Sequence, residues 1–123
     1  MSAWDSAIAF VLDAEGGYVN DPRDAGGETN FGISKRAYPT LDIKALTRDV
    51  AVAIYKRDYW EPAGCEKLPG ALAIAVFDAA VNMGTGTAVR CLQEALGVRA
   101  DGVIGSATLA AVASKNPRSL LVN

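Results

Sequence analysis

The sequence contains no histidine and only two cysteines in 123 residues. Without histidine there can be no Ser-His-Asp or Cys-His nucleophile system, no HExxH zinc site and no proton transfer through an imidazole. Cys65 and Cys91 are too few for a zinc site or a disulfide scaffold, so we expect two reduced cysteines packed as small apolar residues. If the chain is an enzyme, carboxylates are left to transfer its protons.

Charge of one sign and long apolar runs are also scarce. The net charge is -2 and the isoelectric point is near 5.0, so the chain lacks the positive excess of a nucleic-acid-binding protein. The longest apolar run, residues 68–83, is short for a membrane span and contains Asp78 and Asn82, so we expect no stable membrane insertion. The N-terminus lacks the basic segment of a signal peptide, which favours a cytoplasmic location until a route other than Sec export releases the protein.

Length and hydrophobic spacing predict one small, mostly helical protein. With 50% hydrophobic residues, the chain can bury a core, and no coiled-coil seam indicates an oligomer, so a monomer is favoured. Residues 18–33 are rich in turn formers and predict one small, irregular hairpin. Helices are expected over residues 2–15, 47–60, 68–83, 87–96 and from 106 onward. Their expected inward positions include Val50, Ile54, Tyr55, Val89, Leu92, Ala95 and Leu96.

Glu15 is the first candidate for chemistry. It follows Val11 and Leu12 at helical spacing, so it projects from the apolar face at the end of the first helix. Burial there and the negative end of the helix dipole would both favour the protonated carboxyl, as a general acid requires. The spacing alone is equally consistent with a surface glutamate at a frayed helix end.

Two polar residues of the following loop complete the candidate centre. Asp24 lies among groups that would keep it ionised, so it can form an acid and base pair with Glu15. Asp21 and Asp24 on either side of Pro22 are equally consistent with turn-forming Asx residues. Thr29 can hydrogen-bond a nucleophilic water, although threonine in a β-prone segment is commonly just a strand residue.

Asp78 and Asn82 stand one turn apart on the most apolar predicted helix, so they share a face. Buried polar side chains need hydrogen-bond partners. We favour a structural or substrate-orienting role for this pair over direct acid catalysis.

Several longer motifs contain these candidate residues and resemble the motifs of a known family. The segment from Glu15 to Ile33, EGGYVNDPRDAGGETNFGI, together with Tyr59-Trp60 and the run FDAAVNMG at 77–84, resembles the family-108 glycoside hydrolases. These are lysozyme-like N-acetylmuramidases of bacteriophage endolysins and bacterial proteins. Residues 87–113, with LQEALGV and DGVIGSATL, resemble the peptidoglycan-binding region that ends such proteins. The resemblance implies a catalytic region at 1–86 and a helical peptidoglycan-binding-like region at 87–123.

The resemblance also implies a fold, a reaction and a set of site residues. The fold would be mainly α, a lysozyme-like α+β arrangement with a small irregular hairpin next to the active-site helix. The reaction would be hydrolysis of the β-1,4 bond between N-acetylmuramic acid and N-acetylglucosamine, with peptidoglycan glycan strands as the partner and a holin or another route for release. Glu15 matches the catalytic glutamate of the family, and Asp24 and Thr29 fall near the partners in the Glu, Asp, Thr triad of phage lysozymes. Candidate substrate-binding residues are Tyr18, Asn20, Phe31, Tyr59, Trp60 and Asn82, although core packing is the commoner fate of aromatic side chains.

In this interpretation Glu15 protonates the leaving oxygen and Asp24 assists water or stabilises the oxocarbenium-like transition state. A carboxyl separation of about 6.5–9.5 Å favours inversion and about 5–5.5 Å retention, and we favour inversion. Neither mechanism needs a metal or an organic cofactor. Two alternatives remain open: a non-catalytic peptidoglycan-binding or regulatory protein, and a lytic transglycosylase, which uses a single acid.

Overall fold

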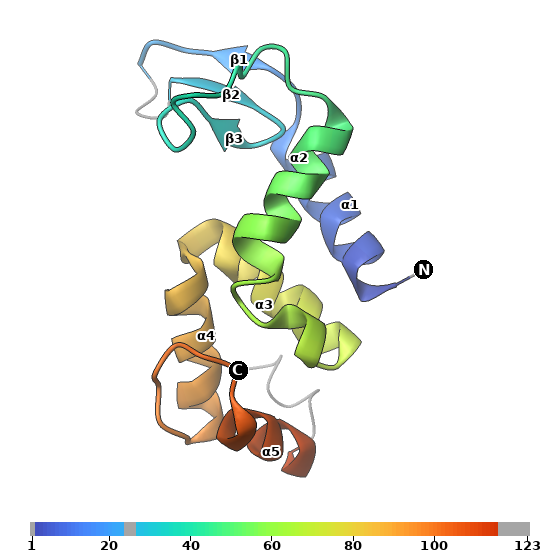
Figure 1. Ribbon diagram of the computed structural model, residues 1–123, viewed down its shortest axis with the longest axis vertical. Helices are drawn as coiled ribbons and strands as arrows, with labels where there is room; N and C mark the ends of the chain where they lie inside the picture. Colours follow the sequence, from blue (N-terminus) through green and yellow to red (C-terminus); the bar gives the residue numbers. More distant parts are fainter. Residues whose placement is uncertain (1, 24–26, 116–123) are drawn as a thin grey trace. The chain divides into compact units, whose positions relative to one another are not determined.

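The computed structural model describes residues 2–23 and 27–115 (Figure 1). Its elements, in chain order, are α1 (Ala3–Glu15), β1 (Val19–Asn20), β2 (Glu28–Asn30), β3 (Ile33–Ser34), α2 (Arg48–Tyr55), the π-helix η1 (Lys56–Trp60), the 3-10 helix η2 (Cys65–Lys67), α3 (Gly70–Met83), α4 (Thr85–Leu96) and α5 (Ser106–Ser114). The fold is mostly helical with one small antiparallel sheet, so the expected fold class is confirmed.

The chain forms two compact units. Residues 8–55 make up the first, which we call the sheet unit, and residues 1–7 with 56–123 make up the second, the helical unit. The boundary expected after residue 86 falls within the first turn of α4, and α3 and α4 both belong to the helical unit. The compact units therefore follow a different division, and the functional division at residue 86 stays a prediction.

Local capping groups set several helix ends. At the start of α1, the Ser2 backbone N–H donates to Asp5 Oδ2 (3.3 Å) and the Asp5 N–H donates to Ser2 Oγ (3.1 Å), which together form a capping box. Thr47 caps α2, because its Oγ1 accepts from the Val50 N–H at 3.3 Å. Gly97 ends α4 in the left-handed conformation, with φ of +74°.

The sheet unit contains the predicted hairpin. Its strands lie in the order β1-β2-β3 and are antiparallel, with Thr29 opposite Val19 on one side and Ser34 on the other. Phe31 and Gly32 join β2 to β3 with φ of +54° and +78°. Two positive φ values in a two-residue loop are the signature of a type I′ turn, which suits the twist of the flanking strands.

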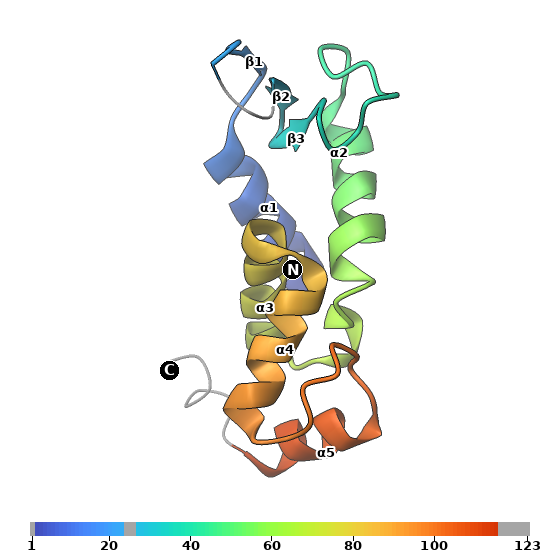
Figure 2. The ribbon, with the colours of Figure 1, turned by 90° about the vertical axis from the view of Figure 1, so that its left-hand side faces the viewer.

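In the helical unit, α4 packs along α3, and α5 packs against α4 (Figure 2). The long apolar run forms α3, which is buried along one side only, although its composition is apolar almost all round. The buried side chains of α3 and α4 are Leu72, Ala73, Val76, Phe77, Ala80, Ala88, Val89, Leu92, Gln93 and Leu96. No helix within residues 2–23 and 27–115 is long and apolar enough to cross a membrane.

Two expected inward positions, Val50 and Ala95, were wrong, and the other five are buried. Val50 is 45% exposed, and Ala95 is exposed, whereas Ala51 and Gln93 are buried. Each residue turns an α-helix by about 100°, so an error of one or two positions moves a side chain from the core to solvent. Cys65 is buried as expected, but Cys91 is exposed, and both thiols are free.

Candidate active site

Glu15 is the last residue of α1, where Gly16 turns the chain with φ of +76°. The negative end of the helix dipole lies beside its carboxyl, as expected. Its side chain is exposed, however, so the burial expected at this position is absent. The helical spacing correctly placed Glu15 beyond Val11 and Leu12, but it gives only a direction and cannot say whether another segment covers the side chain.

The turn between β2 and β3 approaches Glu15 closely. A Cβ atom at Gly32 would lie 2.7 Å from Glu15 Cγ and 2.5 Å from the Tyr55 hydroxyl oxygen. These distances are too short for any side chain, and the φ of +78° also favours glycine. Glu15, Gly32 and Tyr55 therefore meet at one point of the sheet unit.

Tyr55 ties this turn to α2. Its ring is 2% exposed, and its hydroxyl donates to the Phe31 carbonyl oxygen at 2.7 Å. Phe31 has a positive φ, which bulky residues seldom adopt and which persists where the surroundings hold it. The structure thus keeps a strained turn in place beside the candidate acid.

Tyr18 belongs to a second polar group in the sheet unit. Its hydroxyl donates to Glu28 Oε2 at 2.6 Å, and this bond to a carboxylate raises the pKa of Tyr18. The Lys44 Nζ lies 5.9 Å from the centroid of the Tyr18 ring, within cation–π range. Tyr18 is 38% exposed, so part of its surface is available to a ligand.

Asn20 and Thr29 lie on the same small sheet. Asn20 is exposed, lies opposite Glu28 across β1 and β2, and makes a side-chain hydrogen bond with Tyr18. Thr29 is half-buried in the middle of β2, the ordinary strand position that was the alternative to a catalytic role. Its role as a water ligand stays a prediction.

The loop after β1 holds the other candidate carboxylates. Asp21 Oδ1 accepts the Arg23 backbone N–H at 2.9 Å, which forms an Asx turn, one of the two alternatives for this residue, and lowers the pKa of Asp21. Asp24 lies outside the described residues. Within the described residues, no group of three or more histidine, cysteine or acidic side chains is placed to hold a metal ion.

Comparison with known proteins supplies the family. The model of a family described as Glycosyl hydrolase 108 matches residues 8–84, which is more than half of the chain. This chain belongs to the glycosyl hydrolase 108 family. A second model, described as Predicted Peptidoglycan domain, matches residues 87–122 of this family member.

A solved structure agrees with this assignment. The glycosyl hydrolase 108 chain is similar to SagA of Brucella abortus, with 37% sequence identity and a TM-score of 0.86, over 97% of this chain and 73% of that chain. No curated protein matches the chain significantly. The expected family and the lysozyme-like α+β fold are confirmed, and the two family matches support a peptidoglycan hydrolase role with peptidoglycan as the substrate partner.

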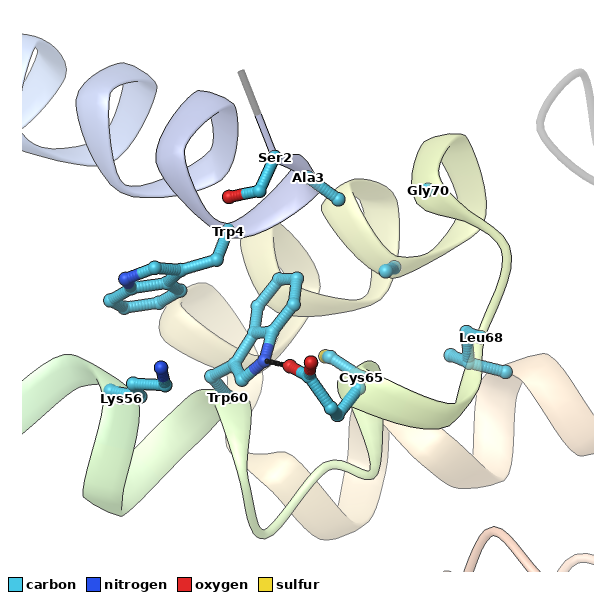
Figure 3. A pocket seen from close by; sticks show the side chains of 10 residues that line it. Ser2, Ala3, Trp4, Lys56, Trp60, Cys65, Leu68 and Gly70 are labelled. Atoms are coloured by element: carbon cyan, nitrogen blue, oxygen red, sulfur yellow. Dashed lines mark hydrogen bonds between the residues drawn. The ribbon is translucent and has the colours of Figure 1, made fainter.

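Trp60 of this family member is a core residue of the helical unit. It is 2% exposed, and its ring meets Trp4 and Phe77 edge-on at centroid distances of 5.2 and 5.6 Å. Its indole N–H donates to Glu66 Oε2 at 2.8 Å, at the side of a hollow of about 250 Å³ (Figure 3). Such burial argues against stacking on a sugar face and favours the packing alternative.

Tyr59 and Asn82 also belong to the helical unit. Tyr59 is half-buried in η1, and Asn82 is exposed near the end of α3. The Asn82 amide donates to the Asp78 backbone carbonyl oxygen, one turn earlier in α3, at 2.9 Å. The two residues are therefore linked as neighbours on one helix face, but through the backbone of Asp78 and not through its carboxylate. Contact of Tyr59 and Asn82 with substrate stays a prediction.

Sequence reasoning missed the part played by Gly32 and by the Tyr55 hydroxyl. The spacing of α2 placed Tyr55 inward, but only as an apolar side chain. The sequence Asn-Phe-Gly-Ile between β-prone residues is compatible with a tight hairpin, and that was the available signal for a glycine with positive φ. Nothing local in the sequence links residue 55 to residue 31.

Proposed function

We propose that this glycosyl hydrolase 108 protein is an N-acetylmuramidase that cleaves the β-1,4 bond between N-acetylmuramic acid and N-acetylglucosamine. The observation that carries the proposal is the placement of Glu15. It ends α1 inside the family match, open to solvent on one side and against the Phe31–Gly32 turn on the other. A general acid needs this combination of access to a ligand and restricted geometry.

The proposed reaction begins with the Glu15 carboxyl. Its proton passes to the glycosidic oxygen as the bond between that oxygen and the anomeric carbon breaks. Water then adds to the anomeric carbon and gives up its proton to a base, which we propose is Asp24. A base acting on water from the opposite face of the sugar inverts the anomeric configuration.

Substrate contacts are proposed for both matched regions. Tyr18 offers a partly exposed ring and Asn20 an exposed amide on the small sheet, which suit stacking and hydrogen bonding to a sugar. Phe31 stands at the turn beside Glu15, so it is proposed to line the same site. Residues 87–123 are proposed to hold the protein on the glycan strands.

The test is release of reducing ends from purified peptidoglycan by the native protein and by Glu15→Gln. The variant keeps the shape of the side chain and removes the transferable proton, so release should fall by at least about a hundredfold. Asp13→Asn is the matched control, because Asp13 is an exposed carboxylate on the last turns of the same helix and should retain activity. A folded native protein that releases no reducing ends would overturn the proposal.

Product mass separates hydrolysis from the alternative chemistry. Hydrolysis adds one water to each cleaved bond, whereas a lytic transglycosylase leaves an anhydro sugar without that water. Native fragments of the hydrated mass support the muramidase, and anhydro products would reject it in favour of a transglycosylase.

A further inference from the structure

We propose that Tyr55 is a positioning residue for Glu15, acting through the Phe31–Gly32 turn. This role rests on the proposed function, in which Glu15 is the general acid. Tyr55 itself need not touch substrate in this arrangement, and its effect passes through backbone atoms of the turn.

Tyr55 is, first, a rigid support. It lies at the end of α2 and is 2% exposed, so packing restricts its ring to one rotamer. Its hydroxyl donates to the Phe31 carbonyl oxygen at 2.7 Å, an ordinary strong hydrogen-bond length. A fixed donor on a helix therefore sets the position of the turn.

The Phe31–Gly32 turn, held in this position, packs against the side chain of Glu15. The point where a Gly32 Cβ would stand is 2.7 Å from Glu15 Cγ and 2.9 Å from Glu15 Cβ. The Gly32 backbone thus covers the stem of the glutamate, while the carboxyl end remains exposed. This contact removes rotamers that would carry the carboxyl into the space of the turn.

Backbone strain makes the turn depend on Tyr55. Phe31 holds a φ of +54°, a conformation that costs free energy for a bulky residue and relaxes when its restraint is lost. The Tyr55 hydrogen bond acts on the carbonyl of this same residue. Without the hydroxyl, the turn is free to shift away from Glu15, and a displacement near 1 Å at a catalytic group can cost about a hundredfold in rate.

The first experiment compares Tyr55→Phe with the native protein on soluble peptidoglycan fragments. Phenylalanine keeps the buried ring and removes only the hydroxyl, so the variant should fold and melt cooperatively. We expect kcat to fall about tenfold or more with KM nearly unchanged, because the substrate still binds while the acid is less often in place.

A second readout separates proton donation from general damage. A synthetic muramyl glycoside with a dinitrophenolate leaving group needs little help from an acid, since that group departs as a stable anion. The kcat deficit of Tyr55→Phe should shrink to about twofold or less on this substrate. A purely structural defect would lower both rates by the same factor.

Two glycine variants test the contact between the turn and Glu15 by changing the turn instead of Tyr55. Gly32→Ala adds a methyl group that collides with Glu15 and Tyr55, at a φ of +78°. Gly27→Ala carries a similar backbone penalty at a φ of +69°, but among the described residues beyond its chain neighbours no atom lies within 4 Å of the added methyl group. We expect Gly32→Ala to lose at least about tenfold more kcat than Gly27→Ala.

The outcomes keep the two proposals apart. A native protein that releases no reducing ends would reject the muramidase. An active native protein with a folded Tyr55→Phe that keeps full kcat, or that loses the same factor on both substrates, would reject the positioning role alone. If Tyr55→Phe fails to fold, equal kcat losses in the two glycine variants would likewise reject the positioning role.

Discussion

The two cysteines of this family member differ in solvent exposure, and we expect them to differ in reactivity. Cys65 is 1% exposed, and burial raises the pKa of its thiol to about 12, so at pH 8 it stays protonated. The thiolate is the species that reacts with alkylating agents, and Cys91 is exposed. We expect iodoacetamide to add one label to the native protein and two to the unfolded protein, counted by mass spectrometry. In Cys91→Ser the native protein should take none, and rapid double labelling of the native chain would contradict the assignment.

Among single residues, the position of Glu15 along its helix was predictable from the sequence, but its exposure was not. Spacing placed Glu15 at the end of α1, because helix geometry depends on local residues alone. Its exposure, the burial of Trp60 and the link from Tyr55 to Phe31 depend on segments far apart in the chain. Composition and periodicity carry no information on such contacts, so these features could not be predicted.

At the scale of the elements, the side chain of Gln93 in α4 forms hydrogen bonds to α5 and to the loop between the two helices. Gln93 is fully buried, and the two hydrogens of its amide nitrogen are shared among Asp101 Oδ1 (2.9 Å), the Val103 carbonyl oxygen (2.9 Å) and Thr108 Oγ1 (3.1 Å). Its amide oxygen accepts the Gly102 N–H at 2.9 Å. The side chain thus joins one helix to the loop and to the next helix.

Removing this network should destabilise the protein strongly. Gln93→Leu keeps most of the volume but removes four hydrogen bonds at once and leaves the buried Thr108 hydroxyl without this partner, so the free energy of unfolding should drop by about 3 kcal/mol. Glu94→Ala, at an exposed position of the same helix, should cost less than about 0.5 kcal/mol. Urea denaturation measures both. Similar costs for the two variants would contradict the proposed importance of Gln93.

Asp101, in the loop between α4 and α5, should make the stability of the protein depend on pH. The hydrogen bond from the Val103 N–H, with help from Gln93, lowers the pKa of Asp101 below its usual 3.8. The stabilisation is therefore present above about pH 4 and lost as pH falls through the folded value. Asp101→Asn should flatten the melting temperature against pH below about pH 4, where the native carboxyl takes up its proton. Parallel curves for the native protein and Asp101→Asn would count against this account.

Element boundaries were predictable where a local group sets them. Ser2, Thr47 and Gly97 act within one turn of themselves, and the structure places helix ends at all three. The single helix expected over residues 47–60 instead changes to a π-helix at Lys56, which takes more residues per turn than the 3.6 that the prediction assumed. Strands of two or three residues are too short for alternation to define a face.

At the scale of the whole molecule, the charge indicates how the protein would hold the cell wall. The chain has a net charge of -2, and residues 87–123 carry four basic and two acidic side chains. This excess is too small for attraction by charge to dominate binding to peptidoglycan. Hydrogen bonds and apolar contacts are left to supply the affinity, and they respond little to salt.

Binding to the wall should therefore be separable from cleavage and nearly independent of ionic strength. Glu15→Gln lacks the proposed acid but keeps the whole matched region at 87–122, so it should sediment with purified insoluble peptidoglycan as well as the native protein does. The bound fraction should change by about threefold or less between 0.05 and 0.5 M sodium chloride. Sedimentation that disappears at high salt would show that charge carries the binding despite its small excess. Failure of the folded variant to sediment at either salt concentration would show that residues 87–123 do not hold this protein on the wall.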